Sequence, residues 1–231
     1  MIEWIVGNCI EIMKGYEDNE FDLCLTDPPY NIGQDYGEFY DDNKSYEEFL
    51  EFSKAWMTEA MRVSKALILS TGFTMLKMYL CDIQYPDSWL CWFHKTARGR
   101  MHNTGAYIHW EPMLVYGKVK LGKSGFHYPV ENYRYIGDGK GRKEKGQDTH
   151  SCGKPRNLYI DVLKECYWGK GKKGNGPKRV LDPMIGSGTT AMACKVLGID
   201  CVGIDINPDY IREAKENIKM IQYGEIDRWF K

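Results

Sequence analysis

The chain has 231 residues, the length of one α/β domain or of one domain with an inserted lobe. Hydrophobic residues make up 43% and charged residues 27%, which allows a packed core and argues against wholesale disorder. No run approaches the roughly 20 apolar residues of a membrane-spanning helix, and the first residues do not resemble a secretory signal. We therefore expect a cytoplasmic protein that has no membrane contact.

The eight cysteines are scattered, and no Cys-x-x-Cys pair offers half of a zinc site. Most of them lie in apolar stretches such as residues 23–25, which indicates buried side chains. We expect reduced thiols rather than a disulfide framework, and we expect no metal site.

The formal net charge of -1 hides a strong asymmetry along the chain. Residues 1–60 hold 3 Lys/Arg against 15 Asp/Glu, whereas residues 95–156 hold 13 against 5. Such a basic block suits a lobe that binds a polyanion, and a solvated loop with surplus lysine is the alternative. The aromatic residues among these charges could stack on unpaired bases or form the core of a small lobe.

Seven elements are predicted before the basic block. They are a strand at residues 4–6, a helical turn at 10–13, a strand at 21–26, a helix from about 46 to 63, a strand at 66–69, a helix near 75–80 and a strand near 89–93. Ser45 and Glu48 form the capping box that begins the long helix. The near-continuous apolar run at residues 66–69 is typical of a strand covered on both faces.

After the basic block, Pro155 is placed to begin a helix that extends to about residue 163. The Gly- and Lys-rich residues 169–178 predict a loop. A strand at 179–181, a helix at 189–197, a strand at 201–204 and a last helix follow, the last with Asn207 as its cap and Pro208 at its first position. Strands that alternate with helices predict a mostly parallel sheet with helices on both faces.

The segment Gly186-x-Gly188 lies between a predicted strand and a predicted helix, where free backbone amides can approach a ligand. Asp205 ends the next strand, where a carboxylate can hold the hydroxyls of a ribose. The same pattern would pass for a nicotinamide dinucleotide site or for a tight turn without ligand. Asp182, just before the loop, favours S-adenosylmethionine, because a carboxylate repels a pyrophosphate but suits a ligand with an ammonium and a sulfonium.

The tetrapeptide Asp27-Pro28-Pro29-Tyr30 follows a predicted strand, so it should lie at the carboxyl edge of the sheet. Two prolines leave carbonyl groups with few local donors. The Asp27 carboxylate and such a carbonyl could accept both hydrogens of an exocyclic amino group, and Asp27 could then take up a proton. Tyr30 offers a face on which a base can stack. The alternative is a proline-stiffened strand end with a capping Asp.

The tetrapeptide and the glycine loop together resemble the amino-group DNA methyltransferases, which methylate N6 of adenine or N4 of cytosine. Residues 182–189 resemble the cofactor loop of that family, and residues 150–155 resemble its His-x-x-x-Lys-Pro element. The motif order resembles the family's beta arrangement, a circular permutation of the Rossmann-like methyltransferase fold. This resemblance implies one catalytic domain over residues 1–231, with residues 97–148 as an inserted target-recognition lobe.

The resemblance also implies site residues. Asp27 and the Pro28 carbonyl would hold the amino group, next to Pro29, and Tyr30 would stack on a base flipped out of double-stranded DNA. S-adenosylmethionine would be bound by Asn8, Cys9, Lys154, Asp182, Pro183, Met184, Gly186, Ser187, Gly188, Thr189, Asp205 and Ile206. Among these, Lys154 would lie near the methionine carboxylate, Asp205 would bind the ribose and Ile206 would lie against the adenine. DNA phosphates would meet Arg98, Arg100, Lys118, Lys123, Arg134, Arg142 and Lys143.

Two positions depart from the family's pattern. Asn8 stands where the family usually has an Asp that accepts from the cofactor's adenine amino group, and its side-chain oxygen could do the same without charge. Met184 stands where the family usually has a Phe.

We therefore expect an S-adenosylmethionine-dependent DNA methyltransferase that flips its target base. We favour adenine N6, because family members with Asp at the first tetrapeptide position are mostly adenine enzymes, and cytosine N4 is the alternative. RNA or a glutamine amide as acceptor, an NAD-dependent oxidoreductase and an inactive DNA-binding homologue are more distant alternatives. The sequence leaves open whether the protein is a homodimer and whether a cognate restriction endonuclease accompanies it.

Overall fold

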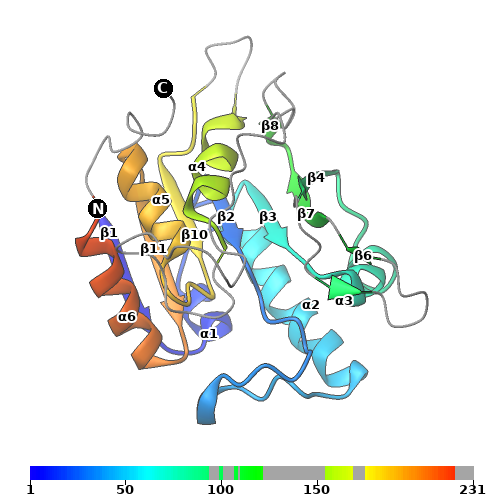
Figure 1. The fold of residues 1–231 in the computed structure, drawn as a ribbon. Helices are drawn as coiled ribbons and strands as arrows, with labels where there is room; N and C mark the ends of the chain where they lie inside the picture. Colours follow the sequence, from blue (N-terminus) through cyan, green and yellow to red (C-terminus); the bar gives the residue numbers. More distant parts are fainter. Residues whose placement is uncertain (94–98, 101–106, 109, 122–153, 169–174, 222–231) are drawn as a thin grey trace.

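The computed structural model describes residues 1–93, 99–100, 107–108, 110–121, 154–168 and 175–221 (Figure 1). A seven-stranded sheet forms within these ranges. Its order is β1 (Ile2–Val6), β11 (Asp200–Asp205), β10 (Arg179–Asp182), β2 (Leu23–Thr26), β3 (Ala66–Ser70), β7 (Trp110–Gly117) and β4 (Ser88–Phe93). The first five strands are parallel, and β7 is antiparallel to both of its neighbours. The predicted Rossmann-like α/β class is confirmed.

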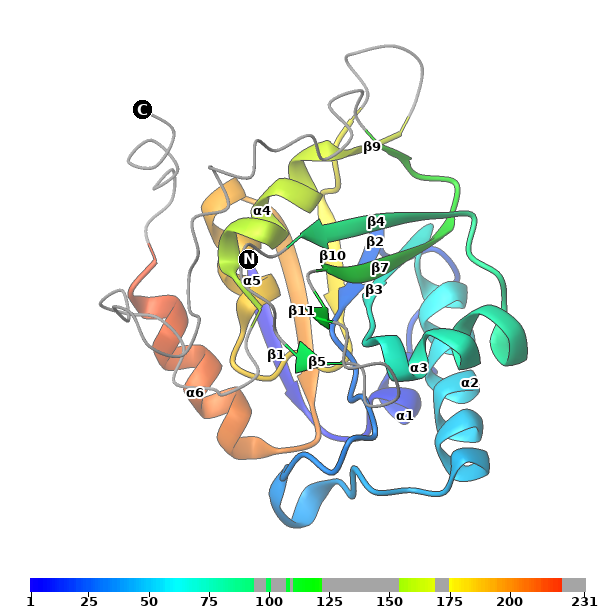
Figure 2. The same ribbon diagram turned by 45° about the vertical axis from the view of Figure 1, so that its right-hand side comes forward.

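Helices cover both faces of the sheet (Figure 2), and a separate hydrophobic core lies between each face and its helices. One face carries α1 (Cys9–Met13), α2 (Tyr46–Val63), α3 (Phe73–Lys77) and a π-helical turn (Met78–Ile83); the other carries α4 (Arg156–Glu165), α5 (Thr189–Leu197) and α6 (Pro208–Lys219). Along β3, Ala66 and Ile68 pack towards α4–α6, whereas Leu67 and Leu69 pack towards α1–α3. Successive strand side chains point to opposite faces, so a strand covered on both sides is apolar throughout.

Local sequence signals place most element boundaries. Ser45 and Glu48 form the predicted capping box, and α2 begins at the next residue. The Asn207 side chain accepts the backbone N–H of Asp209 at the start of α6. Several boundaries differ from the prediction, the first being the start of strand β1, which begins at Ile2 rather than at residue 4. Strand β2 begins only at Leu23, and the helix predicted near residues 75–80 is a short α-helix continued by the π-helical turn.

The structure also differs from the prediction within the span 97–148. Trp110–Gly117 forms β7, which lies between β3 and β4 in the main sheet. Residues 113–116 are buried, and Tyr116 belongs to the core rather than to a separate lobe. The charge of the whole block conceals this apolar run.

Two short pairs lie outside the main sheet, β5 (Gly99–Arg100) with β6 (Tyr107–Ile108) and β8 (Lys120–Leu121) with β9 (Cys166–Tyr167).

Much of the predicted recognition lobe lies outside the described residues, so the lobe stays a prediction. This applies to Arg98, Lys123, Arg134, Arg142 and Lys143. Arg100 lies in β5, and Lys118 is exposed after β7.

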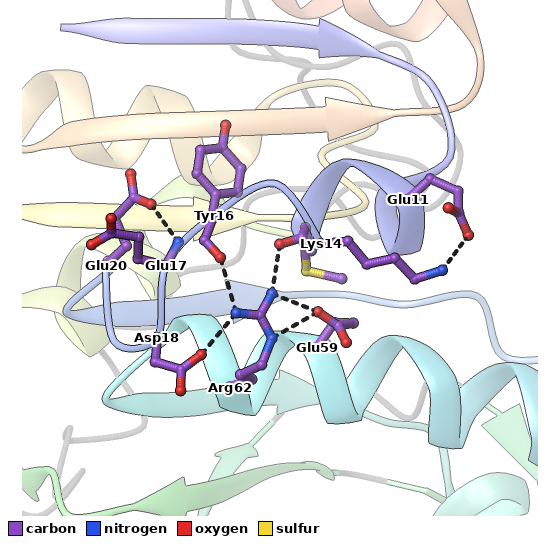
Figure 3. Close-up of polar contacts among 9 residues, drawn as sticks. Glu11, Lys14, Tyr16, Glu17, Asp18, Glu20, Glu59 and Arg62 are labelled. Atoms are coloured by element: carbon purple, nitrogen blue, oxygen red, sulfur yellow. Dashed lines mark hydrogen bonds and ion pairs between the residues drawn. The ribbon is translucent and has the colours of Figure 1, made fainter.

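Arg62, near the end of α2, ties the segment that precedes β2 to this helix (Figure 3). Its guanidinium group donates to the backbone oxygens of Met13 and Tyr16, both at 2.9 Å. It also donates to the carboxylates of Asp18 at 2.8 Å and Glu59 at 2.7 Å. The five N–H donors of an arginine point in fixed directions, so one guanidinium group can bind several backbone and carboxylate oxygens at once. Because the tied segment leads into β2, this network helps to place the strand that ends at the tetrapeptide.

Three further properties of the described ranges bear on the sequence predictions. No helix there is long and apolar enough to cross a bilayer. The seven cysteines described are free thiols, and five of them are buried. Within the same ranges, no group of His, Cys, Asp and Glu side chains is arranged to hold a metal ion.

Candidate active site

A cavity of about 340 Å³ lies at the carboxyl ends of β1, β2, β10 and β11. Parallel strands end at the same edge of a sheet, and α/β folds bind ligands there. The hydroxyl of Thr26, the last residue of β2, donates to the Asp182 carboxylate of β10 at 2.8 Å, although 156 positions separate the two residues. The tetrapeptide and the glycine loop therefore meet at one rim.

Most residues predicted from the sequence lie around this cavity. The lining includes Asn8, Cys9, Asp27, Pro29, Lys154, Asp182, Pro183, Met184, Gly186, Ser187, Thr189, Asp205 and Ile206. The lining does not include Pro28, Tyr30 and Gly188. The side-chain oxygen of Asn8 accepts the N–H of Ile10 at 2.9 Å and caps α1, so one of its acceptor positions is already used.

The glycine loop is held between β11 and α6. Asp205 accepts the backbone N–H of Gly186 at 2.9 Å through one oxygen and that of Asn207 at 2.8 Å through the other. Gly188 has φ +95°, and a Cβ there would lie 2.9 Å from Cβ of Ala214, so only glycine lets the loop pack on α6. Gly186 has φ +49° and no heavy atom within 4 Å of a Cβ position, which leaves open space at the loop.

Asp182 is buried beside the cavity, with 3% of its surface exposed. Its carboxylate accepts hydrogen bonds from Thr26, from the Met184 N–H at 3.1 Å and from the Thr190 hydroxyl at 2.5 Å. Burial raises the pKa of Asp182 to about 7, the three donors oppose this rise, and the Asp27 charge adds to it. The carboxyl therefore titrates near neutral pH, and a cation beside it would favour the ionised form.

The tetrapeptide residues meet Lys154 and Glu111. The Tyr30 hydroxyl donates to Asp27 Oδ1 at 2.6 Å, and Lys154 Nζ lies 3.0 Å from Asp27 Oδ2. Lys154 Nζ also lies 3.0 Å from the Tyr30 hydroxyl and 3.2 Å from Glu111 Oε2. Burial raises the pKa of Tyr30 well above its usual value, and the charges of Asp27 and Glu111 add to this, so the hydroxyl keeps its proton.

Lys154 and Tyr30 make contacts that the sequence did not suggest, and the roles expected of them towards the cofactor and the base stay predictions. Lys154, expected near the methionine carboxylate, is ion-paired with Asp27 and Glu111. Tyr30, expected to stack on a base, uses its hydroxyl on Asp27, and its ring lies so close to Gly72 that a Cβ there would be 3.2 Å from Cδ2 of Tyr30.

One wall of the cavity is aromatic and was not predicted from the sequence. Tyr36 and Tyr40 line it together with Phe52 of α2, and the ring centroids of these neighbours lie 5.9 and 5.4 Å apart. The segment 31–44 is held by Asp42, which is 2% exposed and accepts three backbone N–H groups of residues 31–34 at 2.9–3.0 Å. The spacing of aromatic residues in the sequence does not predict such a wall, because only tertiary contacts bring these side chains to the cavity. Other lining residues that were missed are Gly7, Lys44, Tyr159, Ile185, Thr190, Asn207 and Tyr210.

The cavity fits S-adenosylmethionine chemically. The Asp182 carboxylate suits a ligand that carries an ammonium and a sulfonium group, and a carboxylate such as Asp205 can accept hydrogen bonds from hydroxyl groups. Gly186 lines the cavity, and a side chain at this position would reduce the space available to a ligand. The aromatic wall and Ile206 offer apolar surface for a purine ring.

Comparisons with known proteins agree with this chemistry. The sequence model of the DNA methylase family N6_N4_Mtase matches residues 21–122 and 127–216. The type II methyltransferase M.HpaI of Haemophilus parainfluenzae is 31% identical over 233 residues, which covers 93% of this chain and 73% of that protein. The type II methyltransferase M.HinfI of Haemophilus influenzae is 25% identical over 94% of this chain and 68% of its own length.

Two solved structures share the fold. The M1.HpyAVI–SAM complex superposes with a TM-score of 0.61 at 20% identity, over 95% of this chain and all of that chain. The cytosine-N4-specific PvuII DNA methyltransferase superposes with a TM-score of 0.65 at 11% identity, over 98% of this chain and 90% of that one. The family model matches most of the chain, and the relatives and the solved structures agree with it. The chain belongs to the N6/N4 DNA methylase family and is an S-adenosylmethionine-dependent amino-group DNA methyltransferase.

Proposed function

We propose that the protein methylates N6 of adenine after the base has left the DNA duplex, as a type II modification enzyme. The observation that carries the proposal is that Asp27, Asp182 and Asp205 line one cavity. The aspartate that begins the tetrapeptide favours adenine over cytosine N4, the second candidate, because of the family resemblance described above. A paired base cannot present its amino group to the cavity, so it must leave the stack at a cost of a few kcal/mol.

In this proposal one group of residues binds the target base and another group binds the cofactor. The Asp27 carboxylate and the Pro28 carbonyl accept the two amino hydrogens, which turns the nitrogen lone pair towards the methyl group. Asp27 Oδ2 then receives the proton that the methylated nitrogen releases. The segment 182–189 would hold the methionine part of the cofactor, Asp205 would bind its ribose and Ile206 would lie against its adenine. Bound S-adenosylmethionine supplies the electrophilic methyl group.

The titration of Asp182 predicts a pH-dependent cofactor affinity. Its pKa in the free protein is about 7, so the carboxyl is largely protonated at pH 6. The sulfonium favours the ionised form, so binding releases this proton, and we expect the affinity to rise with pH up to about 7 and then to level off. The slope cannot exceed roughly tenfold per pH unit for one proton.

Calorimetry between pH 5 and 8, in two buffers with different ionisation enthalpies, would measure both the affinity and the released proton. Asp182→Asn should flatten the pH dependence. An affinity that falls as the pH rises, or binding at pH 6 without proton release, would contradict the placement of Asp182 beside the cofactor's charge.

The basic block predicts a salt-dependent interaction with DNA phosphates. Replacing Arg98, Arg100 and Lys143 with glutamine should reduce the slope of log Kd against log salt, by roughly one unit for each phosphate that is no longer neutralised. Fluorescence anisotropy with duplex DNA at several salt concentrations would measure the slope. The matched control is the replacement of the exposed Lys54, Lys77 and Lys164, on helices outside the block. An unaltered slope in the first variant would mean that these three residues do not face phosphate.

Single-molecule sequencing of DNA from a methylation-free host that expresses the protein tests the proposed function most directly. We expect N6-methyladenine at one short recurring sequence. N4-methylcytosine instead would support the second candidate, and DNA without any modified base would overturn the proposal. An Asp27→Ala variant expressed in the same host is the negative control.

A further inference from the structure

Both carboxylate oxygens of Asp27 already have donors. Oδ1 accepts from the Tyr30 hydroxyl at 2.6 Å, and Oδ2 lies 3.0 Å from Lys154 Nζ. Asp27 and Lys154 line the same cavity. An ammonium group offers N–H donors to a carboxylate, as an exocyclic amino group does. In this structure Lys154 therefore lies at the carboxylate oxygen that the target amino group needs, and it occupies one of the acceptor positions of that oxygen.

Glu111 provides Lys154 with a second carboxylate. It lies on β7, its Oε2 is 3.2 Å from Lys154 Nζ, and it is not part of the cavity lining. Burial lowers the pKa of Lys154, but the charges of Asp27 and Glu111 more than offset this, so the pKa lies above its usual value and the side chain is an ammonium. Only 6% of the Lys154 side chain is exposed, and a buried ammonium without a charged partner is costly.

We propose that Lys154 stands in for the target amino group and that Glu111 is a positioning residue, which keeps the ammonium paired when the target displaces it from Asp27. In the free protein the ammonium bridges the two carboxylates. When a base enters, Lys154 stays with Glu111, and Asp27 Oδ2 accepts an amino hydrogen. No covalent bond changes, and the charge of the cluster stays the same. The inference rests on the proposed function, because Asp27 must receive an amino group.

Glu111→Gln tests the inference, because it removes the charge and keeps the shape. Among the described residues, the ammonium then has only Asp27 as a carboxylate partner, so entry of the base leaves it without a carboxylate. With DNA from a methylation-free host and saturating S-adenosylmethionine, we expect kcat to fall at least about tenfold, because the buried ammonium loses the charged partner that would remain when the base enters. KM for DNA should stay within about twofold, because phosphate contacts elsewhere position the duplex. Cofactor affinity measured by calorimetry should be unchanged.

Two further variants separate this role from a structural one. Glu111→Asp keeps the charge but removes a methylene group, so we expect it to retain more activity than Glu111→Gln; a packing role would give the reverse order. Adding Lys154→Met to Glu111→Gln removes the competing ammonium, so kcat should rise above that of the single variant. Glu51→Gln, an exposed change on α2, is the matched control and should leave kcat unchanged.

The outcomes separate this inference from the proposed function. Wild-type protein that transfers no methyl group to DNA would overturn both. With an active wild-type protein, three results would each overturn the role of Glu111 alone: wild-type kcat in Glu111→Gln, a slower Glu111→Asp than Glu111→Gln, or a double variant no faster than Glu111→Gln.

Discussion

Replacing Asp27 with alanine is expected to abolish methyl transfer to DNA while cofactor binding survives. Asp27 accepts the amino hydrogens and then the proton, and the loss of one general acid–base group costs about 10²–10⁴-fold in rate. The neighbouring cluster should persist, because Lys154 retains Glu111 and the Tyr30 hydroxyl as partners. Transfer of a radiolabelled methyl group measures the rate, and calorimetry measures the cofactor affinity, which should change by no more than about twofold.

Two controls make the Asp27 result interpretable. Asp27→Asn keeps the side-chain shape and one acceptor oxygen but cannot take up the proton, so it should also lose most of the activity. Asp87→Asn alters an exposed aspartate next to β4 and should retain wild-type activity. Full turnover by either Asp27 variant would refute the role of this carboxylate.

Replacing Asp205 with alanine is expected to weaken cofactor binding at least about tenfold, in line with the roughly 1.5–3 kcal/mol of a hydrogen bond to a charged group. The Asp205 carboxylate accepts the backbone N–H groups of Gly186 and Asn207, and a carboxylate that accepts from donors at the cavity can also accept from a ribose hydroxyl. The variant therefore has no carboxylate to bind the ribose, and it also releases the glycine loop.

Calorimetry with S-adenosylmethionine measures the affinity of the Asp205 variants, and thermal unfolding reports whether the fold is kept. Asp205→Asn retains one acceptor oxygen, so its affinity should lie between those of the wild type and the alanine variant. An unchanged affinity in the alanine variant would remove the ribose assignment.

Short-range signals in the sequence predicted most of the elements that hold the site. Three such signals are the capping box at Ser45, the Asn207 cap and the apolar run at residues 66–69. Each depends on residues that are close together in the sequence, and the structure confirms each one at the expected position. The alternation of strands and helices also predicted a parallel sheet. A parallel sheet brings strand ends to one edge, which is why the sequence could place Asp27 and Asp182 at one rim.

Interactions across the fold could not be predicted in this way. Strand β7 lies in a block whose overall charge suggested a separate lobe, and its place between β3 and β4 depends on which apolar faces are buried together. Glu111 reaches Lys154 only because that strand is in the sheet. The aromatic wall formed by Tyr36 and Tyr40 likewise depends on Asp42, which folds its segment over the cavity.

The sequence by itself determined which residue types carry the chemistry and at which strand ends they lie, because local backbone preferences and the parallel connection act along the chain. Only the tertiary structure decided which donors occupy the Asp27 carboxylate and which second acid stands beside Lys154. Those pairings depend on strand order and side-chain burial, which are set by packing between segments far apart in the sequence.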